Sequence, residues 1–162
     1  MAQVLGIYVH IPFCRSKCDY CDFYSLEGAQ EQMDQYQKAL LAQIKEAAAA
    51  LKGYQVDTVY FGGGTPSYYG EKRLRDLLSG LKRVFSVSRT PEVTLECNPE
   101  SVDKKSMIRL RKAGFNRVSL GMQSGDAAQL SAIGRPHDVK QVEEAVKALR
   151  EAKFENLSLD LI

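Results

Sequence analysis

Hydrophobic and polar residues follow two patterns that alternate along the chain. Short runs of β-branched and aromatic residues, typical of strands, are separated by longer stretches in which apolar residues recur every three or four positions, as on one face of a helix. The strand-like runs are "VLGIYVHI", "DTVYFG", "EVTLEC", "NRVSLGM" and "LSLDLI", at residues 4–11, 57–62, 92–97, 116–122 and 157–162. The pattern therefore predicts five strands with helical segments between them.

Two of the predicted helices rest on their apolar stripes. The first spans 33–51 and stops near Gly53, and the second lies around 71–85. The stripes consist of Met33, Tyr36, Leu40, Ile44, Ala48 and Leu51 in the first helix and of Leu74, Leu77, Leu78, Leu81 and Phe85 in the second.

Two further helices are predicted from their ends. Ser101 is the expected N-cap of a helix that closes at Gly114. Asp138 and Gln141 have the spacing of a capping box and begin the last helix. The apolar residues of that helix are Val142, Val146 and Leu149.

Repeated strand–helix units indicate the α/β class, with a parallel sheet and right-handed crossovers. Because the strands are almost continuously apolar, we expect the sheet to be buried on both faces. An open doubly wound sheet and a barrel both agree with these patterns.

Composition is that of one ordinary globular domain. The 162 residues are 44% hydrophobic and 26% charged, and the net charge of +2 favours neither nucleic acid nor an anionic membrane as a partner. The apolar stretch near the start is interrupted by His10 and Pro12 and has no basic leader, so it predicts neither a signal peptide nor a membrane span. We therefore expect a cytoplasmic protein, in which clustered thiols bind metals or carry out redox chemistry.

The unusual residues follow the ends of the predicted strands. The motifs are "HIPFCRSKCDYC", "GGGTPS", "ECNPE" and "GMQSGD", and Asp160 lies near the end of the last strand. Since ligands of parallel α/β folds gather at the carboxyl ends of the strands, these motifs predict one binding site.

Three cysteines lie within eight positions. Cys14, Cys18 and Cys21 have the spacing C-x3-C-x2-C, and a short loop can wrap three thiolates around one compact inorganic centre. A zinc site with His10 as fourth ligand and a disulfide that leaves one thiol over are the alternatives. Cys97 lies within a strand, and we expect it to be buried and inert.

The three consecutive glycines of "GGGTPS" need a reason, because glycine runs cost conformational entropy. Close approach to a ligand and a tight turn both explain them. The motif is not a P-loop, since no Lys-Ser/Thr follows the glycines.

Taken together and in order, "YVHIPFCRSKCDYC", "GGGTPS", "ExNP", "GMQS", "GR" and "LDLI" resemble the radical SAM superfamily. They resemble most closely the branch of oxygen-independent coproporphyrinogen III oxidase and its relatives. The resemblance implies a partial TIM-type (β/α)6 barrel, of which this chain supplies about five parallel strands with flanking helices. It covers the front half of a typical member, so we expect residues 1–162 to be the N-terminal part of a radical SAM core domain whose C-terminal part is missing.

The resemblance also implies the cofactors. Cys14, Cys18 and Cys21 would bind a 4Fe-4S cluster and leave its fourth iron open for S-adenosylmethionine, whose reductive cleavage yields a 5′-deoxyadenosyl radical. Tyr8 would lie beside the methionine moiety and Tyr20 near the adenine. The other implied contacts are Gly63, Gly64 and Thr65 in the glycine-rich edge, and the polar side chains of Glu96, Gln123, Arg135 and Asp160. Arg135 would pair with the methionine carboxylate.

Two departures separate the chain from the oxidases of this branch. The oxidases carry a further cysteine two positions after the third, where this chain has Phe23, and they have a substantial segment before the first strand, whereas Cys14 here lies thirteen residues after Met1. Both departures resemble the relatives that act as heme chaperones, which bind heme and deliver it to respiratory enzymes. We therefore expect a heme chaperone, with radical decarboxylation of coproporphyrinogen III, an oxidoreductase activity, as the alternative. The implied partners are S-adenosylmethionine, heme or porphyrinogen, an electron donor and a heme-accepting respiratory protein.

Overall fold

A five-stranded parallel sheet forms the centre of the protein. The computed structural model describes residues 3–28 and 30–162. The strands of the sheet are, in spatial order, β1 (Gln3–Ile11), β4 (Tyr54–Gly63), β5 (Ser86–Cys97), β6 (Arg117–Gln123) and β7 (Asn156–Leu161). Every pairing is parallel, and the spatial order is also the order along the chain. The predicted parallel sheet is therefore confirmed.

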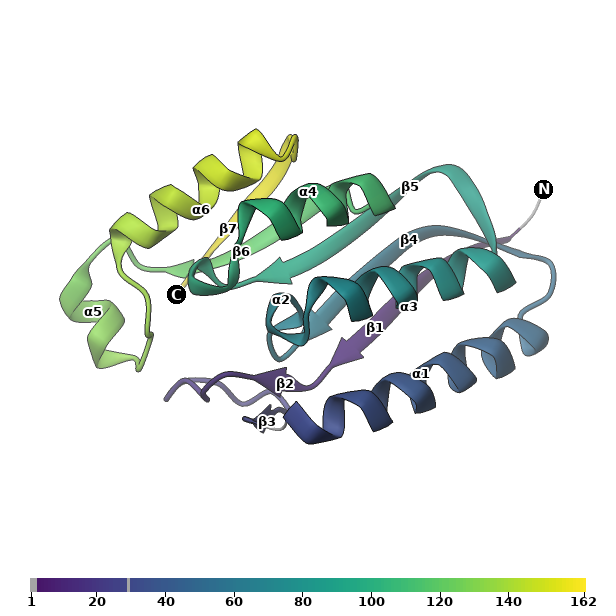
Figure 1. Cartoon of the computed structure of the whole chain (residues 1–162), viewed down its shortest axis with the longest axis horizontal. Coiled ribbons are helices and arrows are strands. Elements are labelled where there is room, and N and C mark those ends of the chain that lie inside the picture. Colours follow the sequence, from purple (N-terminus) through teal and green to yellow (C-terminus); the bar gives the residue numbers. More distant parts are fainter. Residues whose placement is uncertain (1–2, 29) are drawn as a thin grey trace.

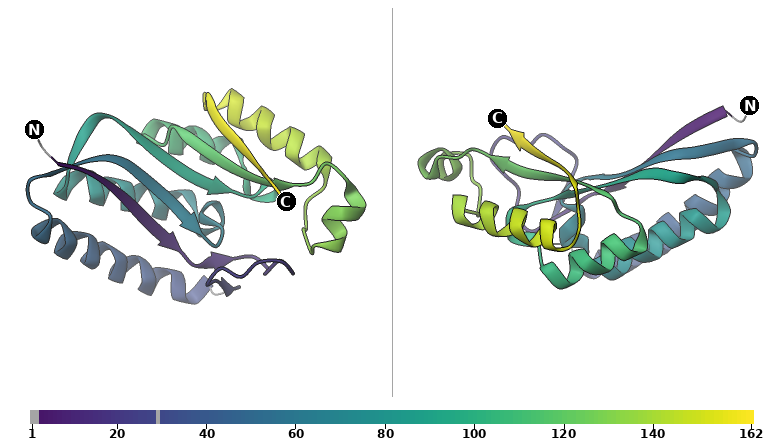
Figure 2. Two further views of the ribbon diagram at one scale, coloured as in Figure 1. Left: turned by 180° about the vertical axis from the view of Figure 1, so that it is seen from behind. Right: turned by 90° about the horizontal axis from the view of Figure 1, so that it is seen from above.

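The four long helices lie on the same face of this sheet, as Figure 2 (right) shows. They are α1 (Gln30–Ala50), α3 (Glu71–Val84), α4 (Lys104–Ala113) and α6 (Val139–Glu151). α1 packs on α3, α3 on α4 and α4 on α6. This arrangement excludes the doubly wound alternative, which needs helices on both faces, and is that of part of a barrel wall.

The hydrophobic core fills the space between the sheet and these helices. Leu74, Leu77, Leu78 and Leu81 of α3 are all buried, as their spacing predicted. In β1, Ile7 and Val9 pack on the core, whereas Tyr8 between them is 58% exposed on the opposite face. The expectation of a sheet buried on both faces is thus wrong, because no helix of the described residues covers the second face.

Some predicted boundaries also differ. β5 begins at Ser86, because Ser86 and Val87 already pair with β4 before the register shifts. Ser101 is not the N-cap of α4: it lies in a 3-10 turn, η1 (Pro99–Ser101), and Asp103 is the cap, accepting a 2.8 Å hydrogen bond from Ser106 N. Gly114 closes the helix with φ 118°, as predicted.

Four short elements had no signal in the sequence. α2 (Pro66–Tyr69) and α5 (Ala127–Ala132) are too short for a helical period to show. β2 (Phe13–Cys14) and β3 (Leu26–Glu27) pair in parallel and bracket the segment that carries the cysteines. No helix of the described residues is long and apolar enough to cross a membrane.

Candidate functional site

A pocket of about 270 Å³ lies at the carboxyl ends of the strands. Figure 1 shows that the segment after β1 and the turns after β4 and β5 lie at this same end of the molecule. Eleven of the twelve predicted site residues line the pocket: Cys14, Cys18, Tyr20, Cys21, Gly63, Gly64, Thr65, Glu96, Gln123, Arg135 and Asp160. Residues that lie up to 146 positions apart in the sequence therefore share one site, counting from Cys14 to Asp160.

The twelfth residue, Tyr8, lies beside this pocket and does not line it. Its ring stacks on that of Tyr60 at a centroid distance of 5.9 Å, and its hydroxyl is 3.3 Å from His10 Nδ1. Burial, and secondarily the nearby charge of Glu96, raise the pKa of Tyr8. In this structure Tyr8 thus belongs to an aromatic cluster on the uncovered face of the sheet.

The three clustered cysteines all face the pocket as free thiols. Cys14 is buried, and Cys18 and Cys21 are half-buried and joined by a turn in which Cys21 N donates to Cys18 O at 3.0 Å. The disulfide alternative therefore finds no support. As the described side chains stand, no three His, Cys, Asp or Glu groups converge enough to hold a metal ion, so the segment gathers the thiols at one pocket without closing them into a ligand set.

The glycines after β4 allow the chain to lie against the cysteine segment. A Cβ on Gly64 would come within 2.9 Å of the backbone N and O of Phe13 and 3.0 Å of Cys14 Sγ. Gly63 has φ +118°, and its Cβ would meet the ring of His10 at 2.5 Å. These contacts fix a tight approach between two protein segments, and the missing Cβ of Gly64 leaves space next to the sulfur of Cys14.

Two carboxylates form part of the pocket wall. Glu96 accepts hydrogen bonds from the Tyr60 hydroxyl at 2.7 Å and from Gly63 N at 3.1 Å. Burial raises the pKa of Glu96 above its usual range, although both hydrogen bonds oppose this shift. Asp160 accepts from Ser119 Oγ with both oxygens, at 2.8 and 2.9 Å. This wall can accept hydrogen bonds from ammonium or hydroxyl groups.

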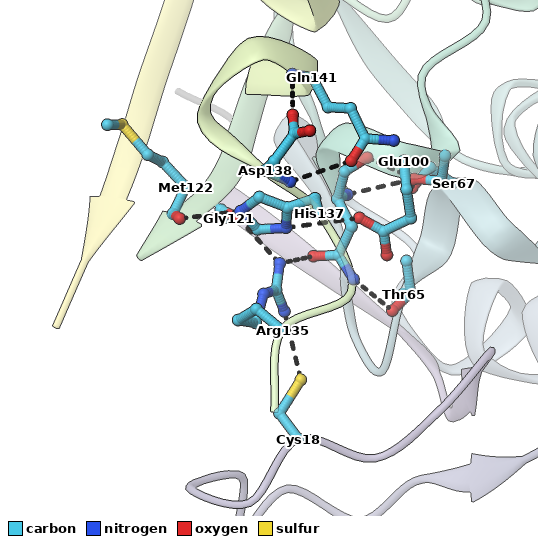
Figure 3. Close-up of polar contacts among 12 residues, drawn as sticks. Cys18, Thr65, Ser67, Glu100, Gly121, Met122, Arg135, His137, Asp138 and Gln141 are labelled. Atoms are coloured by element: carbon cyan, nitrogen blue, oxygen red, sulfur yellow. Dashed lines mark hydrogen bonds and ion pairs between the residues drawn. The ribbon is translucent and has the colours of Figure 1, made fainter. Parts of the chain in front are cut away.

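Arg135 reaches the pocket from the loop before α6 and contacts three parts of the protein (Figure 3). Its Nη2 donates to Asn98 Oδ1 and to Gly121 O, both at 2.8 Å, and its Nη1 donates to Cys18 Sγ at 3.3 Å. The structure thus uses this guanidinium to tie the cysteine segment to the ends of β5 and β6.

Asn98 completes a chain of hydrogen bonds between two of the cysteines. Its Nδ2 donates to Thr65 Oγ1 at 3.1 Å, and Thr65 Oγ1 donates in turn to Cys14 Sγ at 3.6 Å. With Arg135, this chain links Cys14 to Cys18 without passing through the cysteine segment. Asn98 was quoted in the motif "ECNPE" but was not singled out, because an asparagine before a proline also predicts a plain turn.

His10 and Cys97 lie outside the group of three clustered cysteines, although Cys97 also lines the pocket. The His10 ring lies 3.3 Å from both the Tyr8 hydroxyl and the Tyr24 carbonyl oxygen and is next to Gly63, but it does not itself line the pocket, which speaks against a zinc site completed by His10. Cys97 is only 3% exposed, and burial raises its pKa to about 12, so the expectation of a buried residue is confirmed.

Comparison with known proteins identifies the family. The family model described as the radical SAM superfamily matches residues 8–162. The chain belongs to the radical SAM superfamily. This membership implies a 4Fe-4S cluster and S-adenosylmethionine as cofactors, and the radical SAM barrel accounts for the single layer of helices.

Heme chaperones and a coproporphyrinogen III oxidase are among the similar proteins. A protein called heme chaperone HemW from Mycobacterium tuberculosis is 40% identical to the chain, and the one from Escherichia coli K12 is 34% identical. These matches cover 99% and 98% of the chain, respectively, but only 42% of each relative. The structure of coproporphyrinogen III oxidase (HemN) from Escherichia coli, described as a radical SAM enzyme, superimposes with a TM-score of 0.91 at 29% identity, over 99% of the chain and 37% of that protein. The expected partial barrel is confirmed by this match. The chain spans about two fifths of the length of these relatives.

Proposed function

We propose that residues 1–162 are the N-terminal part of a radical SAM core domain in which Cys14, Cys18 and Cys21 bind the 4Fe-4S cluster. The observation that carries this proposal is the convergence on one pocket of eleven site residues, from the ends of five strands and from the loop before α6. The donor set fits the cluster, because three free thiols face one pocket and the Gly64 backbone leaves room beside Cys14. A cluster bound by these three thiolates would have one iron without a protein ligand, which would be available to S-adenosylmethionine for reductive cleavage.

The remaining pocket residues would hold S-adenosylmethionine. Glu96 and Asp160 present carboxylates that accept from ammonium or ribose hydroxyls, and Gly63, Gly64 and Thr65 offer a backbone edge. Tyr20 and Gln123 line the same pocket, and Tyr8 would contact the methionine moiety from its place next to it. For Arg135 to pair with the methionine carboxylate, it has to exchange at least one of its present acceptors, which are Cys18, Asn98 and Gly121.

For the whole protein we propose heme binding and transfer. The support is the name HemW on relatives that are 30–40% identical over nearly the whole chain, together with Phe23 at the position of the additional cysteine of the oxidases. Oxidative decarboxylation of coproporphyrinogen III is the second candidate, favoured by the close superposition on HemN. As a heme chaperone, the whole protein would have heme, an electron donor and a heme-accepting respiratory protein as partners. We propose the cytoplasm as its compartment.

Anaerobic reconstitution with iron and sulfide, followed by EPR of the dithionite-reduced protein, tests the cofactor assignment. We expect a 4Fe-4S signal that changes when S-adenosylmethionine is added. C14A, C18A and C21A should each abolish it, whereas C97A, the matched control at a buried thiol, should retain it. Zinc without sulfide in the isolated protein would overturn the assignment.

Heme titration and a porphyrin assay then separate the two candidates. A chaperone binds heme with a change in the Soret absorption and forms no protoporphyrinogen. Formation of protoporphyrinogen from coproporphyrinogen III would instead establish the oxidase.

A further inference from the structure

Next to the pocket lies a buried pair of ionisable residues that the proposed cofactor contacts do not use. The His137 side chain is completely buried and that of Glu100 is 11% exposed. His137 Nδ1 lies 3.6 Å from Glu100 Oε2, and neither atom has a hydrogen-bond partner among the described residues. Figure 3 shows the two side chains facing each other, above Arg135 in this view.

The geometry of this pair indicates which nitrogen of His137 carries a proton. His137 Nε2 lies 3.0 Å from the carbonyl oxygen of Met122, so this nitrogen has to be the donor. Nδ1 faces a carboxylate oxygen, and the two attract each other when Nδ1 is also protonated. Burial disfavours the charged form of Glu100, but the adjacent His137 ring, the backbone N–H of Glu100 itself and the nearby charge of Arg135 outweigh it, so that the pKa of Glu100 lies below its usual range.

The pair connects the same two strand ends as Arg135. Glu100 belongs to η1 directly after β5, and Met122 lies on β6; Arg135 likewise bridges Asn98 at the end of β5 and Gly121 on β6. Because only Pro136, whose ring fixes φ, separates Arg135 from His137, the placement of one side chain restricts that of the other.

We propose that Glu100 and His137 are positioning residues that hold the loop 134–137 in place, so that Arg135 stays directed at Cys18. Hydrogen bonds to cluster-ligating sulfurs raise the reduction potential of the cluster, and partners that orient such groups strengthen metal binding. The inference rests on the proposed function, since Cys18 is a cluster ligand only under that proposal. Neither member of the pair lines the pocket.

E100Q and H137Q test the pair, with D138A as the matched control. Asp138 follows His137 directly and accepts from Gln141 N at 2.7 Å, so its removal weakens the start of α6 and leaves the pair untouched. In the reconstituted protein, E100Q and H137Q should lose iron to a chelator roughly tenfold faster than the unmodified protein and D138A. Their reduction potential should also shift to more negative values, a change that a general loss of stability does not produce.

A second measurement needs no cluster. Arg135 Nε is buried, so its N–H proton should exchange slowly with water and give a resolved 15N–1H signal, assigned by its absence in R135K. The signal should persist in D138A and be lost in E100Q and H137Q. E100Q changes only one group and keeps the test decisive where H137Q does not fold.

The outcomes are distinguishable. Unchanged iron loss, potential and Arg135 signal in E100Q would overturn the positioning role, and so would equal effects in D138A. Failure of the unmodified protein to take up a cluster would refute the proposed function instead, and the Arg135 signal would then decide the positioning role alone.

Discussion

At the scale of single residues, the pocket depends on close approach between segments that lie far apart in the sequence. The turn after β4 donates from Gly64 N to Ile11 O and from Thr65 N to Phe13 O, both at 2.8 Å, so the glycine-rich turn is hydrogen-bonded to the start of the cysteine segment. A side chain at Gly64 would separate the two. The consecutive glycines thus have a role in the protein itself, before any ligand is considered.

We predict that G64A disrupts the pocket. The new Cβ would overlap the Phe13 backbone, which cannot yield as a flexible side chain can, and overpacking of this kind costs about 1–3 kcal/mol. Chemical denaturation measures the loss, and iron and sulfide analysis after reconstitution should show less cluster. G125A is the control, since its Cβ would meet only Met122 Cε at 3.6 Å; an equal effect there would contradict the explanation.

Glu96 should make stability depend on pH. Its folded pKa is raised by burial, so the folded state binds this proton more tightly than the unfolded chain. The resulting stabilisation is fully present below the ordinary pKa of 4.5 and is lost as the pH rises through the folded pKa. Urea denaturation of the protein and of E96Q from pH 4 to 7 should show their difference in unfolding free energy changing in that direction; a difference independent of pH would refute it.

At the scale of elements, the residue at which a helix begins is determined by its capping residue more than by its apolar stripe. Asp103 caps α4 through its carboxylate, with the pKa of that group lowered by the backbone N–H of Ser106. Ser101, two residues earlier, accepts from Asn98 N at 3.2 Å and so closes η1 instead. Serine and aspartate are both good N-caps. Ser101 is engaged by the tight turn after Asn98, which leaves Asp103 as the cap of α4.

D103A should therefore destabilise the protein by about 1 kcal/mol, because it leaves the first turn of α4 without its acceptor. D103N should retain most of the stability, since asparagine caps equally well. Thermal or urea denaturation at neutral pH measures both. Equal losses in the two variants would mean that the charge, and not the cap, supports the helix.

Periodicity predicted the elements that have enough residues to show it, and chemistry predicted the pocket. The leucine stripe of α3 and the capping box of α6 could be predicted because each is a local pattern. The motifs at the strand ends predicted one pocket, whereas the individual contacts, such as Glu96 and Arg135, were implied by the resemblance to the radical SAM superfamily. The sequence could not show which side chains from different strand ends contact each other. The hydrogen-bond chain Cys14–Thr65–Asn98–Arg135–Cys18 and the Glu100–His137 pair depend on distances between strand ends that no local pattern encodes. The uncovered face of the sheet was missed because β-branched residues are common on both faces of a strand.

At the scale of the whole molecule, the helices stabilise one side of the sheet and the pocket lies at one end of it. The cysteine segment is fixed to this body by the short β2–β3 pair, Arg135 and the glycine turn. A cluster bound there would join the segment to the strand ends and would favour the folded state.

We predict that cluster binding raises the melting temperature by roughly 5–10 °C, given about 2.7 kcal/mol from a ligand at a hundredfold its dissociation constant and 2–4 °C per kcal/mol for a chain of this size. Anaerobic calorimetry before and after reconstitution measures the shift, and removal of the cluster by a chelator should reverse it. C18A should show no rise. An equal rise in C18A would mean that the added iron stabilises the protein elsewhere.

The spatial order of the strands has a consequence for biosynthesis. Because each strand pairs with the one before it in the chain, the strand–helix units can dock in turn as they leave the ribosome. The thiols belong to the first unit, whereas Arg135 follows Cys18 by 117 residues. Nascent chains should therefore keep Cys18 open to alkylation until Arg135 has emerged, so the three clustered thiols stay exposed to the cell for most of the synthesis of residues 1–162.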